Sequence, residues 1–192
     1  MLDLIGIIYF TLSTLSLLGI FPIGIYEFLD LREGYAISDY GYLFETGLYF
    51  SISAIITGLL CGLDAITNPI YKKVKKLTYN YHALAAFTLL GIGLFPLTGE
   101  IGWTSSRVFH WLFALSFLYV YPFTRLLIIR HFSKRLFKKL MIIFLGINIG
   151  GLLMIPLFGI KYVAYTEYLV WIALLITITI SNIYLSKKSQ NL

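Results

Sequence analysis

Residues 42–76 read YLFETGLYFSISAIITGLLCGLDAITNPIYKKVKK, an apolar run that ends in a cluster of lysines. The run from Tyr42 to Leu63 approaches the roughly 20 residues that a helix needs to cross a bilayer. It is continuous, whereas a strand of a membrane barrel alternates over about ten residues. The stretch therefore predicts a transmembrane helix, and the lysines predict the side on which that helix leaves the membrane.

The whole chain has the composition of a membrane protein. Of its 192 residues, 59% are apolar and 12% are charged, whereas about a quarter of the residues in a soluble domain are charged. A surface that faces lipid accommodates this excess of apolar residues. The length predicts a single integral membrane domain over 1–192. Frequent Ile, Tyr and Lys, with a single Gln, are typical of a thermophile.

Six apolar stretches of this kind predict an all-α bundle of six transmembrane helices, arranged as three helical hairpins. The first stretch follows Asp3 with no basic residue and no cleavage site, so it predicts a spanning helix and not a signal peptide. The predicted helices cover about 4–25, 42–63, 77–97, 108–129, 140–158 and 168–185.

The basic residues predict the orientation. Eleven Lys and Arg residues fall in the second and fourth connections and the tail, against three in the other connections. This bias predicts a multi-pass protein of the cytoplasmic membrane with both termini on the cytoplasmic side. We expect the segment 130–139 to lie on the membrane surface and to attract anionic lipid head groups. The charge is thereby explained without a nucleic-acid partner.

Three similar phrases close the first, third and fifth apolar stretches: GIFPIG at 19–24, GLFPLTG at 93–99 and MIPLFG at 154–159. Because Pro and Gly end helices, the phrases predict stops at the outer ends of three helices.

One group of polar and aromatic residues is expected at the outer ends of the helices. It can form a shallow outward-facing site, or it can be an ordinary head-group layer with aromatic anchors. The candidate residues are Glu45, Glu100, Trp103, Arg107 and His110.

A second group falls near the inner ends of the helices and consists of Asp64, His82 and Arg125. Ionisable residues at membrane depth are costly, so we expect them to cluster and to form an Asp64–Arg125 ion pair with His82 beside it. Such a cluster can act as a gate or proton relay, or it can simply neutralise itself.

Small residues predict close helix packing in two places. Ala54, Gly58 and Gly62 repeat at four-residue spacing, and Gly146 and Gly150 form a GxxxG pattern around Asn148. Such faces let helices approach closely, and a buried Asn can bond to a neighbouring helix.

No cofactor or metal is expected. His82 and His110 would lie in opposite leaflets, on the order of 20 Å apart, which is too far for two axial ligands of one haem. Cys61 is the single cysteine of the chain, and no zinc-site spacing or nucleophile motif occurs. This favours a protein that is not an enzyme.

Two stretches carry a resemblance to a known family. AISDYGYLFETGLYFSISAIITGL (36–59) and GIGLFPLTGEIGWTSSRVFHWLFALSFLY (91–119) resemble segments of the domain-of-unknown-function family numbered 998. The resemblance implies a small six-span membrane protein of the archaeal and bacterial type and transfers no biochemical activity. The matching positions are Ser38, Asp39, Gly41, Pro96 and His110.

The sequence therefore predicts a bundle that binds membrane lipid or another membrane protein, as an accessory subunit of a larger complex. Two alternatives stay open, a small transporter or channel and a membrane enzyme that acts on lipid.

Overall fold

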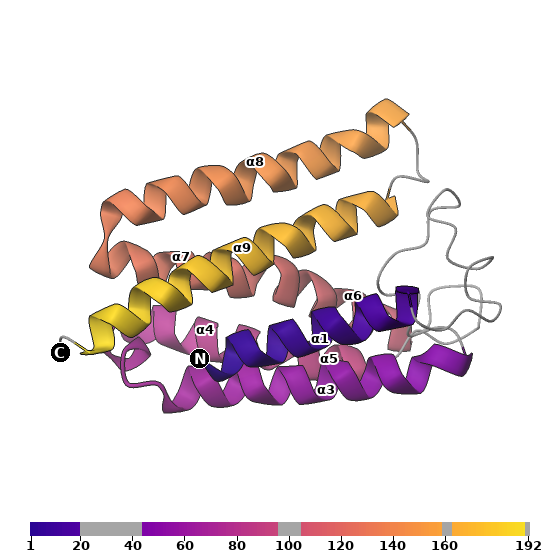
Figure 1. Cartoon of the computed structure of the whole chain (residues 1–192), viewed down its shortest axis with the longest axis horizontal. Helices are drawn as coiled ribbons and strands as arrows, with labels where there is room; N and C mark the ends of the chain where they lie inside the picture. Colours follow the sequence, from indigo (N-terminus) through magenta and orange to yellow (C-terminus); the bar gives the residue numbers. More distant parts are fainter. Residues whose placement is uncertain (20–43, 96–104, 159–162, 191–192) are drawn as a thin grey trace.

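Every regular element in the described part of the chain is a helix, in a computed structural model that describes residues 1–19, 44–95, 105–158 and 163–190 (Figure 1). This confirms the prediction of an all-α protein. The elements are α1 (Leu2–Gly19), α3 (Phe44–Thr67), the short 3-10 helix η3 (Tyr71–Lys73), α4 (Lys76–Ala86), α5 (Thr88–Leu94), α6 (Ser105–Leu115), the π-helical segment η4 (Ser116–Val120), α7 (Tyr121–Phe132), α8 (Lys134–Phe158) and α9 (Val163–Gln190).

Four helical stretches are long and apolar enough to cross a membrane, and they correspond to four of the six predicted spans. One of them runs without interruption through α6, η4 and α7. The four stretches are Gly47–Thr67, Val108–Phe132, Lys134–Met154 and Thr166–Lys188. A shorter apolar stretch, Leu2–Thr14, lies in α1. The described residues therefore have the character of a membrane protein.

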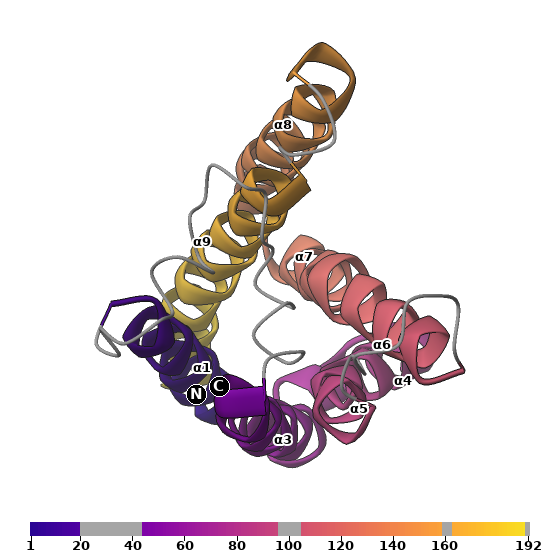
Figure 2. The same ribbon diagram turned by 90° about the vertical axis from the view of Figure 1, so that its right-hand side faces the viewer.

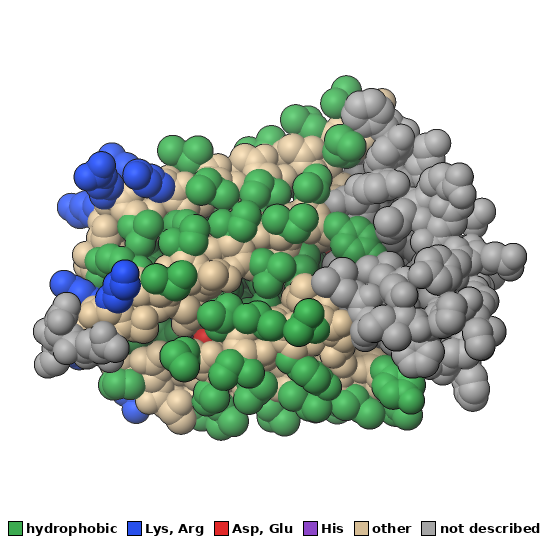
Figure 3. All heavy atoms as spheres, viewed as in Figure 1, with side chains coloured by type: hydrophobic (Ala, Val, Ile, Leu, Met, Phe, Trp, Pro, Cys, Tyr) green, Lys and Arg blue, Asp and Glu red, His purple; other side chains and the backbone are tan. Residues whose placement is uncertain are grey.

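The helices lie side by side along the long axis of the molecule, and the start of α1 and the end of α9 lie toward the same end of it (Figure 1). Seen along this axis, α8 is the outermost helix and lies beyond α9 (Figure 2). Lys and Arg side chains gather at the end that holds the termini (Figure 3). Apolar side chains cover much of the remaining described surface in this view.

The third predicted span differs from the expectation of one continuous helix, because it is divided at Phe87 into α4 and α5. The Phe87 N–H binds the carbonyl of Leu84, and Leu90 N–H binds that of Phe87, so the chain tightens locally to three-residue spacing. The Thr88 hydroxyl donates to the Ala85 carbonyl at 2.6 Å and occupies that backbone acceptor.

The basic segment 130–139 is helical, whereas the sequence predicted a surface loop. Ser133 alone separates α7 from α8, and its hydroxyl caps α8 by accepting the Leu136 N–H at 3.2 Å. Pro156 lies inside α8, which ends at Phe158 within the third phrase. Pro22 and Pro96 of the other two phrases lie outside the described residues.

Glycines let α3 and α5 approach closely. A Cβ added at Gly58 would lie 2.3 Å from the backbone nitrogen of Leu90, and one at Gly62 would lie 2.1 Å from the ring of Phe87. Ala54, the third small residue of this face, is fully buried. The four-residue spacing in α3 thus meets the tightened backbone around Phe87, and small residues are what this contact needs.

The GxxxG pattern of α8 differs from the packing that the sequence predicted. Apart from the adjacent residues and backbone of α8 itself, no described atom lies within 4 Å of a Cβ added at Gly146 or Gly150. Asn148 is buried, but its amide donates within its own helix to the Phe144 carbonyl at 2.6 Å. Gly151 is the glycine of α8 that meets a neighbour, since a Cβ there would lie 3.4 Å from Thr166 of α9.

These contacts predict opposite effects of one substitution at two glycines. Gly58→Ala is expected to lower the stability by about 1–3 kcal/mol, because α5 must move to admit the methyl group. The matched control Gly146→Ala is expected to be neutral or to stabilise by up to about 1 kcal/mol, since Ala favours a helix over Gly. Thermal unfolding in detergent, followed by circular dichroism, measures both. Equal shifts in the two variants would contradict the packing described.

Candidate functional site

A buried ion pair joins the start of the chain to its middle. Arg125 of α7 places Nη2 3.2 Å from Oδ2 of Asp3 in the first turn of α1, and neither side chain has exposed surface. Arg125 also donates to Ser181 at 2.9 Å and to Asn182 at 2.7 Å, both on α9. Asn182 in turn donates to Asp3, as does the Tyr121 hydroxyl. Three helices therefore meet at one charge pair.

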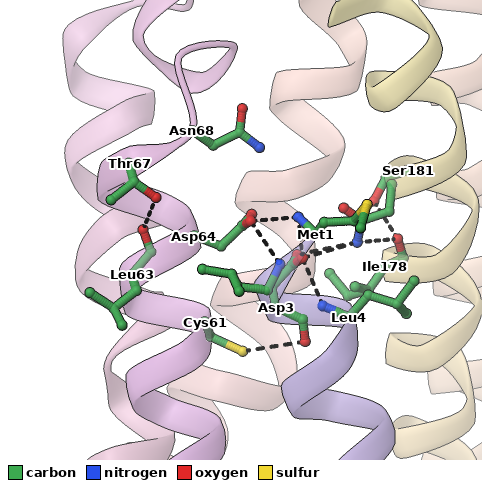
Figure 4. A network of polar contacts seen from close by, with 12 residues as sticks. Met1, Asp3, Leu4, Cys61, Leu63, Asp64, Thr67, Asn68, Ile178 and Ser181 are labelled. Atoms are coloured by element: carbon green, nitrogen blue, oxygen red, sulfur yellow. Dashed lines mark hydrogen bonds and ion pairs between the residues drawn. The ribbon is translucent and has the colours of Figure 1, made fainter.

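A second carboxylate, that of Asp64 on α3, lies close to Asp3 (Figure 4). It accepts hydrogen bonds from the N-terminal ammonium of Met1, from the Leu2 N–H at 3.0 Å and from the Tyr71 hydroxyl at 2.9 Å. The Met1 ammonium also lies 3.3 Å from Asp3. Two carboxylates thus face two cationic groups, and the charges balance.

His82 completes the cluster. Its Nδ1 lies 3.0 Å from the Thr124 hydroxyl, which itself donates to the Tyr121 carbonyl. The imidazole stacks on the Tyr121 ring with centroids 5.0 Å apart and meets the Tyr71 ring edge-on at 4.9 Å. Arg125 lies over the same Tyr71 ring at 4.8 Å. His82 Nε2 and Arg125 Nη1 have no hydrogen-bond partner.

The structure thus brings Asp64, His82 and Arg125 together around Tyr71, but Arg125 has a different partner from the one predicted. Its ion pair is with Asp3, because α1 begins at Leu2 and carries Asp3 into the bundle. The sequence analysis missed Asp3, which it placed outside the membrane, and it missed the polar pair Ser181–Asn182. Two adjacent polar residues inside an otherwise apolar span were the signal that could have found this partner.

We name this cluster the inner network. Its chemistry is that of a structural contact, in which paired charges and hydrogen bonds hold helices together. Both oxygens of Asp3 and both oxygens of Asp64 accept hydrogen bonds. A carboxylate held in this way is well suited to compensating a buried guanidinium.

A different site lies around His110 on α6. This side chain is fully buried, and its Nδ1 lies 2.9 Å from the carbonyl of Phe95, just beyond α5. A carbonyl only accepts, so Nδ1 carries the hydrogen. In the neutral imidazole Nε2 is then an acceptor, and it has no partner.

His110 lines a narrow pocket whose interior has room for about one water molecule. We name it the aromatic pocket, because half of its lining residues carry aromatic rings. Phe10 contacts both Phe50 and Trp171, with ring centroids 5.4 and 5.0 Å apart. The pocket joins an apolar enclosure to one buried acceptor. The ring residues of its wall are Phe10, Phe50, Phe117 and Trp171, and Glu167 also lines it.

Of the predicted outer group, His110 is the residue whose side chain the structure describes. Glu100 and Trp103 lie outside the described residues, and so do the side chains of Glu45 and Arg107. The sequence analysis missed the ring residues and Glu167. Aromatic residues are spread over the whole chain, so no pattern distinguished these rings from the others.

Comparisons of the chain with family models, with curated proteins and with solved structures found no match. The resemblance to the domain-of-unknown-function family numbered 998 therefore stays a prediction. Within the described residues, no group of three His, Cys, Asp or Glu side chains is arranged to hold a metal ion.

The inner network predicts a large cost for removing one partner of the ion pair. Asp3→Asn leaves the guanidinium of Arg125 buried without its carboxylate, and we expect a loss of about 3–5 kcal/mol in stability. The double variant with Arg125→Met removes the uncompensated charge and should recover part of this loss. Thermal unfolding in detergent measures both, with Lys187→Gln as a control for loss of an exposed charge. Strictly additive effects of the two substitutions would contradict the pairing.

Proposed function

We propose that the chain is a six-span protein of the cytoplasmic membrane with both termini on the cytoplasmic side. Four helices meet the length and composition of a span. The apolar helix α1 and the consecutive helices α4 and α5 lie alongside them and would supply the other two (Figure 1). The orientation is supported by the basic side chains at the end that holds both termini (Figure 3).

The function that the geometry supports best is the binding of a membrane lipid without catalysis. The observation that carries this proposal is the unpartnered Nε2 of His110 in the wall of the aromatic pocket. A buried acceptor without a partner costs about 1–3 kcal/mol. A ligand that donates one hydrogen bond through the narrow pocket and lays an apolar chain along its mouth would remove this cost. A lipid that carries a hydroxyl group has both features.

The second candidate function is that of an accessory subunit in a larger membrane complex. It is favoured by α8, where 22% of the apolar stretch is buried, against 50% in each of the other three spans. Exposed side chains along α8 include Ile142, Ile149 and Leu157. A partner helix would cover this face, as membrane lipid does in its absence.

The proposed orientation predicts the outcome of cysteine labelling. In a Cys61→Ala background, we expect cysteines introduced at Lys73 and Lys134 to react from the cytoplasmic side. A cysteine at Glu33, which lies outside the described residues, is expected to react from the external side. A membrane-impermeant maleimide applied to intact cells and to inverted vesicles measures this. The reverse pattern would overturn the orientation.

The lipid proposal predicts that two replacements of His110 behave differently. Asn can keep the Nδ1 hydrogen bond to Phe95 while removing Nε2, whereas Gln can replace Nε2 instead. His110→Asn is expected to weaken retention of the bound lipid by roughly threefold to tenfold, the worth of one hydrogen bond, and His110→Gln is expected to keep it.

Native mass spectrometry after gentle extraction measures the retained lipid. Ser186→Ala, at an exposed residue near the end of α9, serves as the control. A bare monomer in the unmodified protein, or equal retention in all three variants, would count against the proposal.

A further inference from the structure

A groove at the end of the molecule that holds the termini concentrates positive charge. It lies between the start of α4 and the corner where α7 meets α8, with about 890 Å³ of empty space including its mouth. We name it the basic groove. Its polar wall is formed by Lys75, Thr78, Arg130, His131 and Lys134.

The described side chains offer this groove no counter-charge. Their acidic members are Asp3, Asp64 and Glu167. Asp3 and Asp64 belong to the inner network, and Glu167 lines the aromatic pocket near the opposite end of α9. Like charges held close together repel each other, so a surface of this kind favours a bound anion.

The start of α4 strengthens this preference. Its N-cap residue is Lys75, with no side-chain cap, and its first turn holds no acidic residue. A helix N-terminus carries a partial positive charge and unbonded N–H groups, so acidic side chains are favoured there and basic ones are not. Here a lysine occupies the cap and the groove lies directly beside it. A phosphate group would bind both the lysine and the helix end.

The position of the groove identifies the source of the phosphate. The groove lies where two span-length stretches, Val108–Phe132 and Lys134–Met154, end, which is the level of the lipid head groups. One turn deeper, Tyr81 follows Thr78 on α4 and Phe123 precedes Leu127 on α7, and both rings are exposed. They provide an apolar surface for an acyl chain directly below the groove.

We propose that the basic groove binds the phosphate of an anionic lipid from the leaflet at this end of the molecule, with a lipid chain along Tyr81 and Phe123. This site is separate from the aromatic pocket, and it depends only on the chain being a membrane protein. His110→Asn is therefore expected to leave it unchanged, so that failure of either proposal can be recognised.

The test compares two triple variants that remove equal charge from the same end of the molecule. Lys75→Gln, Arg130→Gln and Lys134→Gln neutralise the groove, and Lys138→Gln, Lys187→Gln and Lys188→Gln neutralise exposed positions outside it. The full chain in detergent is titrated with phosphatidylglycerol or phosphatidylcholine, and bound lipid is counted by native mass spectrometry. We expect the natural chain and the control to prefer phosphatidylglycerol by about tenfold or more, and the groove variant to lose this preference.

Two further measurements test the site, one with a charge-conserving variant and one with a soluble competitor. The charge-conserving variant with Lys75→Arg, Arg130→Lys and Lys134→Arg should retain the preference even if the neutralised groove does not fold. Glycerol 3-phosphate, which has the head-group phosphate without acyl chains, should not displace the lipid at equal concentration. Equal loss in the groove and control variants would reveal diffuse surface attraction and overturn the site. Displacement by glycerol 3-phosphate would overturn the lipid as its occupant.

Discussion

The buried ion pair between Asp3 and Arg125 is the contact on which the arrangement of the helices depends. Both side chains are fully buried, and a guanidinium in an apolar interior is costly unless a carboxylate meets it. This constraint fixes the position of α1 along α7. The hydrogen bonds of Arg125 to Ser181 and Asn182 fix α9 against the same pair. The first, middle and last parts of the chain therefore share one fixed register.

The inner network and the aromatic pocket are connected by packed rings. Phe117 lines the pocket and also stacks on Tyr121, with ring centroids 5.2 Å apart. Tyr121 in turn donates to Asp3 and stacks on His82. A substitution at Phe117 would therefore disturb both sites at once. His110 belongs to the pocket wall alone, because its Nδ1 bonds to Phe95 and not to the network. A substitution there therefore tests the proposed lipid binding without removing a contact of the network.

The spans were largely predictable because hydrophobic length is a local property, but their irregularities were not. The division at Phe87 depends on a local change of hydrogen-bond spacing and on the glycines of α3, which admit the displaced backbone. Within the inner network, burial cost correctly indicated that Asp64, His82 and Arg125 gather. It could not choose between Asp3 and Asp64 as the partner of Arg125, because that choice depends on how the helices pack.

The basic residues also show that sequence alone does not predict features that depend on how distant segments pack. Their distribution along the chain predicts a side of the membrane, and this prediction needs only their number in each connection. Whether they repel one another over a wide surface or converge on one ligand depends on contacts between distant segments. Here the single-residue turn at Ser133 folds α8 back beside α7, and the packing of α4 on α7 brings Lys75 opposite Arg130 and Lys134. Basic residues from separate connections are thereby concentrated into one groove, and the proposed lipid site depends on this convergence, which no single segment of the sequence contains.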